Sequence, residues 1–367
     1  MGMIKYIFHI VFILLFACNA SPLLAQKNHQ KEYRIDLVLP FKSGGNHSAV
    51  GEAMLDYYQG FVMGAQQLEA EGFKAKIRVF DSEKDSAALE NIISNDELNQ
   101  ASIIIGPVYQ GPMEKTASYC QNKSMYLVSP LKYYKPTATN QNIVNFFAPD
   151  SIRLKATAEK AFKLFPKHRY FIITDANSKS KADALLVKLA CKNLGITNVK
   201  TLTLTNGRLS SPITRPDSII IFNTIENAAV KPDLEKIIKN KKRSWIIAHQ
   251  DWHGNYKTVV NKDEPNILYP EVTIATPGDT LSEAFEDLYY ESYYSEPSKY
   301  AYIGYDQATF LGYGLMAFGD SFVQQTLNMD YRGFISHILL RQHGNQFLNY
   351  GIHFIRISDG LREEVEP

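Results

Sequence analysis

The segment His249-Gln250-Asp251-Trp252-His253 groups the side chains in this sequence that are best suited to chemistry. Two histidines four residues apart could hold zinc on a helix. The segment instead follows an apolar run, lacks a glutamate at the general-base position and has no evident third ligand. Two alternatives remain: a structural loop, or a binding loop in which Gln250 and Asp251 form hydrogen bonds and Trp252 stacks on a ligand. We therefore predict no metal and no cofactor, and keep Gln250, Asp251 and Trp252 as candidate ligand-binding residues.

Catalytic and nucleic-acid-binding signatures are not apparent in the sequence. No G-x-S-x-G elbow, Walker loop or G-x-G-x-x-G motif follows the first apolar run, so we do not expect an enzyme. Lys and Arg number 39 against 38 Asp and Glu, and this balance gives no electrostatic case for binding nucleic acid or coating an anionic membrane. Cys120 and Cys191 fall in different parts of the chain, and we expect both to be unpaired, inert thiols.

The N-terminus reads as an export signal. A cationic start at Met1–Lys5 precedes an apolar run, Tyr6–Cys18, that is shorter than the ~20 residues of a transmembrane helix. Two modes of processing are open: cleavage after Ala25, which makes 1–25 a signal peptide, or a lipobox at Leu15-Phe16-Ala17-Cys18 with lipidation of Cys18. Either predicts an exported, periplasmic protein that reaches a membrane only through a lipid anchor.

The rest of the chain alternates strands and helices, which predicts two α/β blocks with doubly wound parallel sheets. Helices are expected at 54–68, 85–95, 113–120, 154–165, 181–194, 232–240 and 281–294, and after Asp306, which we expect to cap the last of them. Gly60 and Gly64 are expected to let the first helix approach a sheet closely. Strands are expected at 33–40, 76–81, 102–105, 125–128, 170–174, 199–204, 218–222, 244–248, 272–276 and 352–357, with loops at 205–216 and 261–270.

In doubly wound sheets, ligands bind outside the carboxyl ends of the strands, where helix N-termini present free N–H groups. The loops that follow the predicted strands therefore hold the candidate site. Besides the three residues of the 249–253 segment, the candidate ligand-binding residues are Lys42, Tyr109, Gln110, Lys132, Tyr133, Asn177 and Thr224.

Several stretches, in this order and spacing, resemble the type I periplasmic binding proteins. They are Tyr57-Tyr58-Gln59-Gly60-Phe61, Ile104-Ile105-Gly106-Pro107-Val108, Tyr126-Leu127-Val128-Ser129-Pro130-Leu131, Asn145-Phe146-Phe147-Ala148-Pro149 and Tyr302-Ile303-Gly304-Tyr305-Asp306. The resemblance implies two lobes, 33–149 plus 277–335 and 150–276 plus 336–367, joined by a hinge of three crossovers near 147–150, 276–279 and 328–341. It also implies a cleft between the lobes. Within the family, the chain looks most like the peptidoglycan-associated relatives of amino-acid ABC transporter substrate-binding proteins, without their LysM module.

The resemblance implies a non-catalytic protein that captures an amino acid-, peptide- or muropeptide-like solute by hinge closure. Two departures from the family pattern weaken the case for an α-amino acid. Gln110 stands where amino-acid-binding members carry a serine that bonds the ligand carboxylate, and Leu131-Lys132-Tyr133 replaces a small residue and a threonine. The alternative is an envelope scaffold or regulator of cell-wall synthesis that keeps the fold and binds a protein partner or a peptidoglycan fragment.

Overall fold

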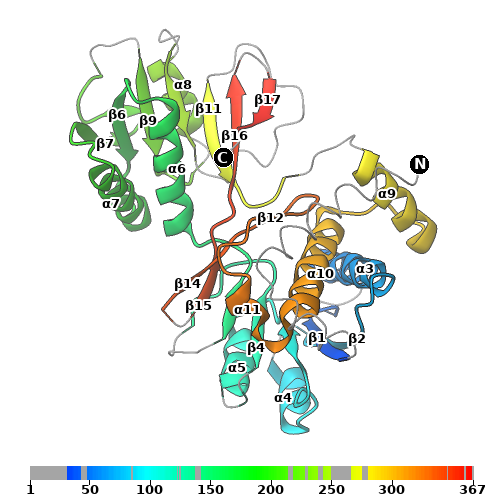
Figure 1. Ribbon diagram of the computed structural model, residues 1–367. Coiled ribbons are helices and arrows are strands. Elements are labelled where there is room, and N and C mark those ends of the chain that lie inside the picture. The colour runs from blue at the N-terminus through cyan, green and yellow to red at the C-terminus, as the bar shows by residue number, and fades with distance from the viewer. Residues whose placement is uncertain are drawn as a thin grey trace. The chain divides into compact units, whose positions relative to one another are not determined.

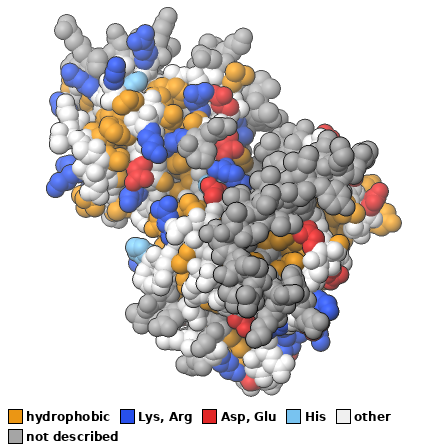
Figure 2. All heavy atoms as spheres, viewed as in Figure 1, with side chains coloured by type: hydrophobic (Ala, Val, Ile, Leu, Met, Phe, Trp, Pro, Cys, Tyr) orange, Lys and Arg blue, Asp and Glu red, His pale blue; other side chains and the backbone are white. Residues whose placement is uncertain are grey.

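The computed structural model describes residues 31–42, 48–83, 86–121, 123, 125–136, 142–213, 218–227, 230–238, 243–248, 266–274, 280–344, 346–358 and 361–365. The chain forms two compact units (Figure 1). Unit 1 comprises the chain up to Ala148 and the segment Ile274–Gly351, whereas unit 2 comprises Pro149–Thr273 and the chain from Ile352 onward. On the face shown in Figure 2, Lys and Arg side chains are interspersed with Asp and Glu, in keeping with the net charge of +1.

Unit 1 is built on a sheet with the strand order β14-β15-β5-β4-β3-β1-β2. Its strands are β1 (Tyr33–Leu39), β2 (Ala75–Asp81), β3 (Ile103–Ile105), β4 (Tyr126–Ser129), β5 (Ile143–Asn145), β14 (Leu340–His343) and β15 (Gln346–Asn349). Neighbours pair in parallel except for the antiparallel hairpin of β14 and β15. The helices are α3 (Ala49–Glu69), α4 (Ser86–Ser94), α5 (Gln110–Gln121), α9 (Thr280–Tyr293), α10 (Lys299–Phe318) and α11 (Phe322–Gln325), and β12 (Tyr331–Arg332) pairs with β13 (His337–Ile338).

Unit 2 has the strand order β17-β16-β11-β10-β9-β6-β7-β8. Its strands are β6 (Arg169–Thr174), β7 (Val199–Thr205), β8 (Arg208–Leu209), β9 (Ile219–Asn223), β10 (Trp245–Ile247), β11 (Ile267–Glu271), β16 (His353–Ser358) and β17 (Leu361–Glu364). Strands β7, β6, β9, β10 and β11 are neighbours in this order and pair in parallel. Antiparallel strands border this group on both sides, β8 next to β7, and β16 with β17 next to β11. The helices are α6 (Asp150–Leu164), α7 (Ser178–Asn193) and α8 (Lys231–Ile238). Among the described residues, no helix combines the length and apolarity that a membrane span requires.

The strand predicted at 272–276 is misplaced. β11 instead occupies Ile267–Glu271, inside the stretch 261–270 that was expected to be a loop. Pro270 indicated a loop because it cannot donate to a strand ladder. The parallel pairing of β11 with β10 ends at Leu268, however, so Pro270 lies beyond it, and the strand continues there through its antiparallel pairing with β16.

The prediction that 336–351 belong to the second lobe is also wrong. β15 pairs in parallel with β5, with Phe347 opposite Val144, so this stretch completes the sheet of unit 1. The third crossover therefore lies at Gly351–Ile352 rather than within 328–341. The β14–β15 hairpin contains several polar residues, so its sequence did not indicate a strand pair at the edge of the sheet.

Helices α3 and α10 pack against each other, side by side in Figure 1, and they meet at glycines. A Cβ atom on Gly60 would lie 1.9 Å from the carbonyl oxygen of Ala301, and one on Gly304 would lie 2.1 Å from the carbonyl oxygen of Tyr57. Such distances are far inside van der Waals contact, so only glycine lets the two backbones approach this closely. Gly60 and Gly64 therefore serve a helix–helix contact and not the predicted approach to a sheet.

Asp306 does not cap a helix, contrary to expectation. α10 begins at Lys299, where the hydroxyl of Ser298 accepts a hydrogen bond from the N–H of Tyr300 at 3.2 Å. Asp306 lies within α10, and burial raises the pKa of its carboxyl to about 6. Its oxygens accept hydrogen bonds from the backbone N–H groups of Phe334 (2.7 Å), Ile335 (3.0 Å) and Ser336 (2.9 Å). The side chain thus anchors the segment between β12 and β13 onto α10.

Replacing Tyr57 with phenylalanine is expected to lower the free energy of unfolding of unit 1 by about 1–3 kcal/mol. The Tyr57 hydroxyl donates to Gln307 Oε1 at 2.7 Å, and the tyrosine is fully buried, so the change leaves a buried acceptor without its donor. Urea denaturation followed by circular dichroism measures the loss. Tyr290→Phe, at a position that is 52% exposed, is the control and should change stability by less than about 0.5 kcal/mol. Equal effects of both changes would contradict this assignment.

Candidate functional site

The carboxyl edge of the unit 1 sheet brings five of the predicted residues onto neighbouring loops. Strands β4, β3 and β1 are adjacent and parallel, so the chain leaves each of them at the same edge. Lys42 follows β1, the pair Tyr109 and Gln110 follows β3, and the pair Lys132 and Tyr133 follows β4. Lys42, Gln110 and Lys132 are exposed, whereas the two tyrosines are half-buried. This edge therefore presents cationic, amide and phenolic groups together.

The loop after β4 is held by the chain itself. Ser129 Oγ donates to the carbonyl oxygen of Lys132 at 2.7 Å, and Gln110 Nε2 donates to the carbonyl oxygen of Lys135 at 3.4 Å. The second bond ties the start of α5 to the β4 loop. Burial raises the pKa of Tyr133, so its phenol stays neutral at physiological pH and can donate a hydrogen bond.

Gln307 positions the start of the same loop from α10. Its Nε2 donates to the carbonyl oxygen of Pro130 at 2.7 Å, while its Oε1 accepts from the Tyr57 hydroxyl. A buried chain of hydrogen bonds thus joins α3, α10 and the end of β4. The polar side chains of the β4 loop consequently project from a backbone that hydrogen bonds hold at Pro130 and at Lys135.

In unit 2, Asn177 and Thr224 have roles in the fold. Asn177 caps α7, since its side chain accepts a hydrogen bond from the N–H of Lys179 at 2.8 Å. Thr224 is completely buried after β9, and its hydroxyl lies 3.1 Å from the carbonyl oxygen of Ile173 and 3.0 Å from that of Ser180. Asn177 remains exposed at the edge, but Thr224 has no surface to offer a ligand, so its prediction as a ligand-binding residue is corrected.

A network of charged side chains, centred on Lys179, lies at the carboxyl edge of the unit 2 sheet. Its Nζ is 3.2 Å from Asp150 Oδ2 and 3.4 Å from Asp183 Oδ2, and it also pairs with Glu226. Burial opposes ionisation of Lys179, but these carboxylates outweigh it and raise the pKa of the ammonium group. Burial likewise opposes ionisation of Asp150, and the nearby Arg153 and Lys179 reverse that effect and lower its pKa. Both groups are therefore charged at neutral pH.

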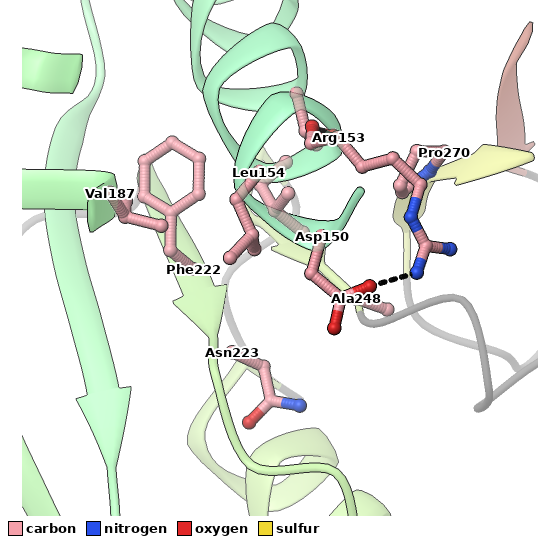
Figure 3. A pocket seen from close by; sticks show the side chains of 10 residues that line it. Asp150, Arg153, Leu154, Val187, Phe222, Asn223, Ala248 and Pro270 are labelled. Atoms are coloured by element: carbon pink, nitrogen blue, oxygen red, sulfur yellow. Dashed lines mark hydrogen bonds and ion pairs between the residues drawn. The ribbon is translucent and has the colours of Figure 1, made fainter. Parts of the chain in front are cut away.

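A pocket opens beside this network, between the start of α6 and the ends of β9, β10 and β11 (Figure 3). Asp150, Arg153 and Asn223 supply its polar groups, and its apolar lining includes Leu154, Phe222 and Pro270. Figure 3 shows the Arg153 guanidinium paired with Asp150. Among the described residues, the buried Nε–H of Arg153 has no hydrogen-bond partner. The enclosed space measures about 20 Å³, room for about one water molecule, so this pocket alone cannot enclose an organic solute.

Asp150, Arg153, Lys179 and Glu226 are not among the site residues predicted from sequence. One sequence feature could have indicated Asp150 and Arg153. Both lie in the first turn of α6, the helix that follows Phe146-Phe147-Ala148-Pro149. Lys179 and Glu226 lie in the loop stretches predicted to face a ligand, but only contact in three dimensions shows that they pair.

The remaining predicted residues, Gln250, Asp251 and Trp252, lie outside the described residues, as does the whole segment 249–253. The residues that the structure describes include no group of three His, Cys, Asp or Glu side chains placed to hold a metal ion. Cys120 and Cys191 are buried and unpaired, and burial raises their pKa values to about 12 and about 11. Both are therefore poor nucleophiles.

The architecture matches that of solved binding proteins. A protein from Rhodospirillum rubrum, assigned as a branched-chain amino acid ABC transporter, aligns with a TM-score of 0.67 at 12% identity, over 91% of this chain and 100% of that one. This chain has the type I periplasmic binding protein fold. The type I fold also relates it to an ABC transporter substrate-binding protein from Desulfitobacterium hafniense in complex with Leu, with a TM-score of 0.56 and 15% identity over 91% and 100% of the two chains.

A second kind of type I fold protein is also similar. Full-length LpoA from Haemophilus influenzae aligns with a TM-score of 0.61 at 14% identity, over 96% of this chain and 61% of that one. The sequence itself matches no family model and no curated protein. At identities this low, the structural similarity establishes the fold alone. It confirms the fold that the sequence predicts.

Proposed function

We propose that the protein is an exported, non-catalytic solute-binding protein that captures a small ligand between its two units by hinge closure. The observation that carries this proposal is the unit 2 pocket, where Arg153 keeps a buried donor unpaired beside an apolar lining. The fold is shared with a substrate-binding protein solved in complex with Leu. Because the enclosed space is so small, the pocket would anchor one group of the solute, and the unit 1 edge would supply the other contacts.

The chemistry of the anchor favours a carboxylate. The Nε–H of Arg153 is a charged donor that can bond a carboxylate oxygen, while a terminal nitrogen of the same guanidinium pairs with Asp150. Amino acids, peptides and muropeptides all carry this group, and each is a candidate solute. Lys42, Tyr109, Gln110, Lys132 and Tyr133 remain proposed contacts from unit 1, with Asn177, Gln250, Asp251 and Trp252 from unit 2.

A thermal-shift screen against amino acids, peptides, muropeptides and sugars tests this function. A ligand at about 100 times its Kd stabilises the folded state by about 2.7 kcal/mol, which corresponds to a rise in Tm of about 3–4 °C for a chain of this length. Arg153→Gln is expected to weaken binding of the active compound at least tenfold. Lys155→Gln, an exposed change on the same helix, is the control and should leave binding unchanged. A flat response to every compound would contradict solute binding.

The second candidate function is an envelope scaffold or regulator of cell-wall synthesis that binds a protein partner or a peptidoglycan fragment. The observation that favours it is the bond from Gln110 to the carbonyl oxygen of Lys135, which engages the side chain at the position of the family's ligand-binding serine. LpoA shows that the same fold occurs as part of a larger protein. A flat thermal-shift screen would move the assignment to this function, with a protein partner in place of a peptidoglycan fragment.

Export can be tested separately from ligand binding. If Cys18 is lipidated, several acyl chains hold the protein on a membrane, at about 0.8 kcal/mol per buried CH₂ group. Cys18→Ala is then expected to move the protein from the membrane fraction to the soluble fraction of the cell envelope. If cleavage follows Ala25, the protein is soluble both before and after the substitution. Retention in the cytoplasm would contradict both modes of export.

A further inference from the structure

Helix α7 in unit 2 is apolar on two opposite faces. Its inner face packs into the unit through buried residues that include Ala184, Val187 and Cys191. Its outer face carries Leu185 and Leu189, one helical turn apart and 67% and 52% exposed. Leu186, 37% exposed, widens this apolar ridge. The three leucines are neighbours on the helix surface and form a contiguous exposed apolar patch, a feature that marks interaction surfaces.

Lysines border the ridge along one side. Lys181, Lys188 and Lys192 are exposed, and none forms an ion pair with another described residue. The one acidic residue of the helix, Asp183, faces inward and is buried. The outer surface of α7 is therefore apolar in its centre and purely cationic at its border, a combination that fits an apolar partner with acidic side chains.

Helix α9 in unit 1 has the complementary character. Glu283, Asp287 and Glu291 recur every four residues along its exposed side, and the helix contains no basic residue. Leu288 and Tyr290 flank this acidic stripe and are 54% and 52% exposed. The acids span about 12 Å along the helix axis and the lysines of α7 about 16 Å, at ~1.5 Å per residue, so the two stripes can lie along each other.

We propose that α7 of one copy of this protein docks on α9 of a second copy, with the leucine ridge against the apolar flanks and the lysines against the acids. Pairing of α7 with α7 is disfavoured, because an antiparallel pair would bring Lys181 close to Lys192 of the partner copy. The near-zero net charge of the whole chain, +1, leaves little overall repulsion between copies. The contact joins two different surfaces, so it is heterologous and leaves each copy with a free α7 or α9 until a ring closes.

Sedimentation velocity of the full mature chain, from about 1 to 500 μM in 50 mM NaCl, tests this contact. The wild-type protein is expected to sediment faster as its concentration rises, and 500 mM NaCl should weaken the association because it screens the charges. Replacing both Leu185 and Leu189 with serine should raise the dissociation constant at least tenfold while leaving the circular dichroism spectrum unchanged. A wild-type protein that stays monomeric throughout would overturn the proposal.

Charge reversal identifies the two surfaces. Lys181→Glu/Lys188→Glu/Lys192→Glu on α7 and Glu283→Lys/Asp287→Lys/Glu291→Lys on α9 should each abolish self-association. An equimolar mixture of the two variants should associate again, because the unchanged α7 of one variant meets the unchanged α9 of the other, and the acidic α7 meets the basic α9. A matched reversal of the exposed lysines outside α7, at Lys163, Lys167 and Lys200, should leave association as in the wild type.

Two outcomes would overturn the assignment of surfaces. One is a mixture that remains monomeric although both variants are folded. The other is wild-type binding to phosphatidylglycerol vesicles without self-association, which would assign the basic ridge of α7 to an anionic lipid surface.

Discussion

Replacing Gly304 with alanine is expected to lower the free energy of unfolding of unit 1 by about 3 kcal/mol or more. The new Cβ would lie 2.1 Å from the carbonyl oxygen of Tyr57 and 2.9 Å from the amide nitrogen of Phe61. Both atoms belong to the backbone of α3, so no side chain can rotate away to relieve the clash. The two helices must separate, and the buried aromatic residues Tyr57 and Phe61 of α3 lose packing contacts.

Urea denaturation of Gly304→Ala measures this effect, with Gly111→Ala as the matched control. A Cβ on Gly111 in α5 meets nothing within 4 Å, so that change should be neutral or stabilise by up to about 1 kcal/mol. The two tryptophans, Trp245 and Trp252, both belong to unit 2. In Gly304→Ala, unit 1 should unfold at a lower urea concentration than unit 2. Far-ultraviolet circular dichroism should therefore show this first transition more strongly than tryptophan fluorescence does. Similar stability for both variants would contradict the close helix contact.

Replacing Asn349 with aspartate is expected to cost unit 1 about 3–5 kcal/mol at pH 7. Asn349 is 1% exposed and makes a full set of hydrogen bonds. Its Oδ1 accepts from the N–H groups of Leu339 and Gly351, both at 2.8 Å, and its Nδ2 donates to the carbonyl oxygens of Phe146 (2.9 Å) and His337 (2.8 Å). An aspartate would turn a charged oxygen toward two carbonyl oxygens.

The pH dependence of this variant provides an independent check. Burial and the facing carbonyl oxygens would raise the pKa of the new carboxyl in the folded state above its value in the unfolded chain. A group of this kind adds stability below its unfolded pKa and loses it as pH rises through its folded pKa, so the deficit of Asn349→Asp should shrink between pH 7 and pH 4. Asn91→Asp on the exposed side of α4 is the control. A deficit that does not depend on pH would show that the aspartate finds other partners.

Continuous apolar runs made the buried strands predictable from sequence. Ile103–Ile105 and Ile219–Asn223 are short and buried on both faces, so their burial pattern follows from composition alone. Elements whose position depends on distant partners were misplaced. The start of α10 was missed because Gly304 and Asp306 suggested a boundary, whereas their roles come from contacts with α3 and with residues 334–336.

The candidate site was predictable where it follows from strand order. Loops after adjacent parallel strands must lie together, and this placed Lys42, Gln110 and Lys132 at one edge of unit 1. The state of each side chain was not predictable, because it depends on packing. Thr224 is buried, with its hydroxyl near the carbonyl oxygens of Ile173 and Ser180, and Arg153 pairs with Asp150 on the same helical turn.

Calorimetric titration of the compound that gives the largest thermal shift tests the central claim of solute binding most directly. The wild-type protein is expected to bind one molecule of ligand per chain. Arg153→Gln in unit 2 and Tyr133→Ala in unit 1 should each weaken binding at least tenfold, because both edges contact the same molecule in the proposed complex. Binding that neither substitution affects, or the absence of binding heat with every compound, would contradict the account.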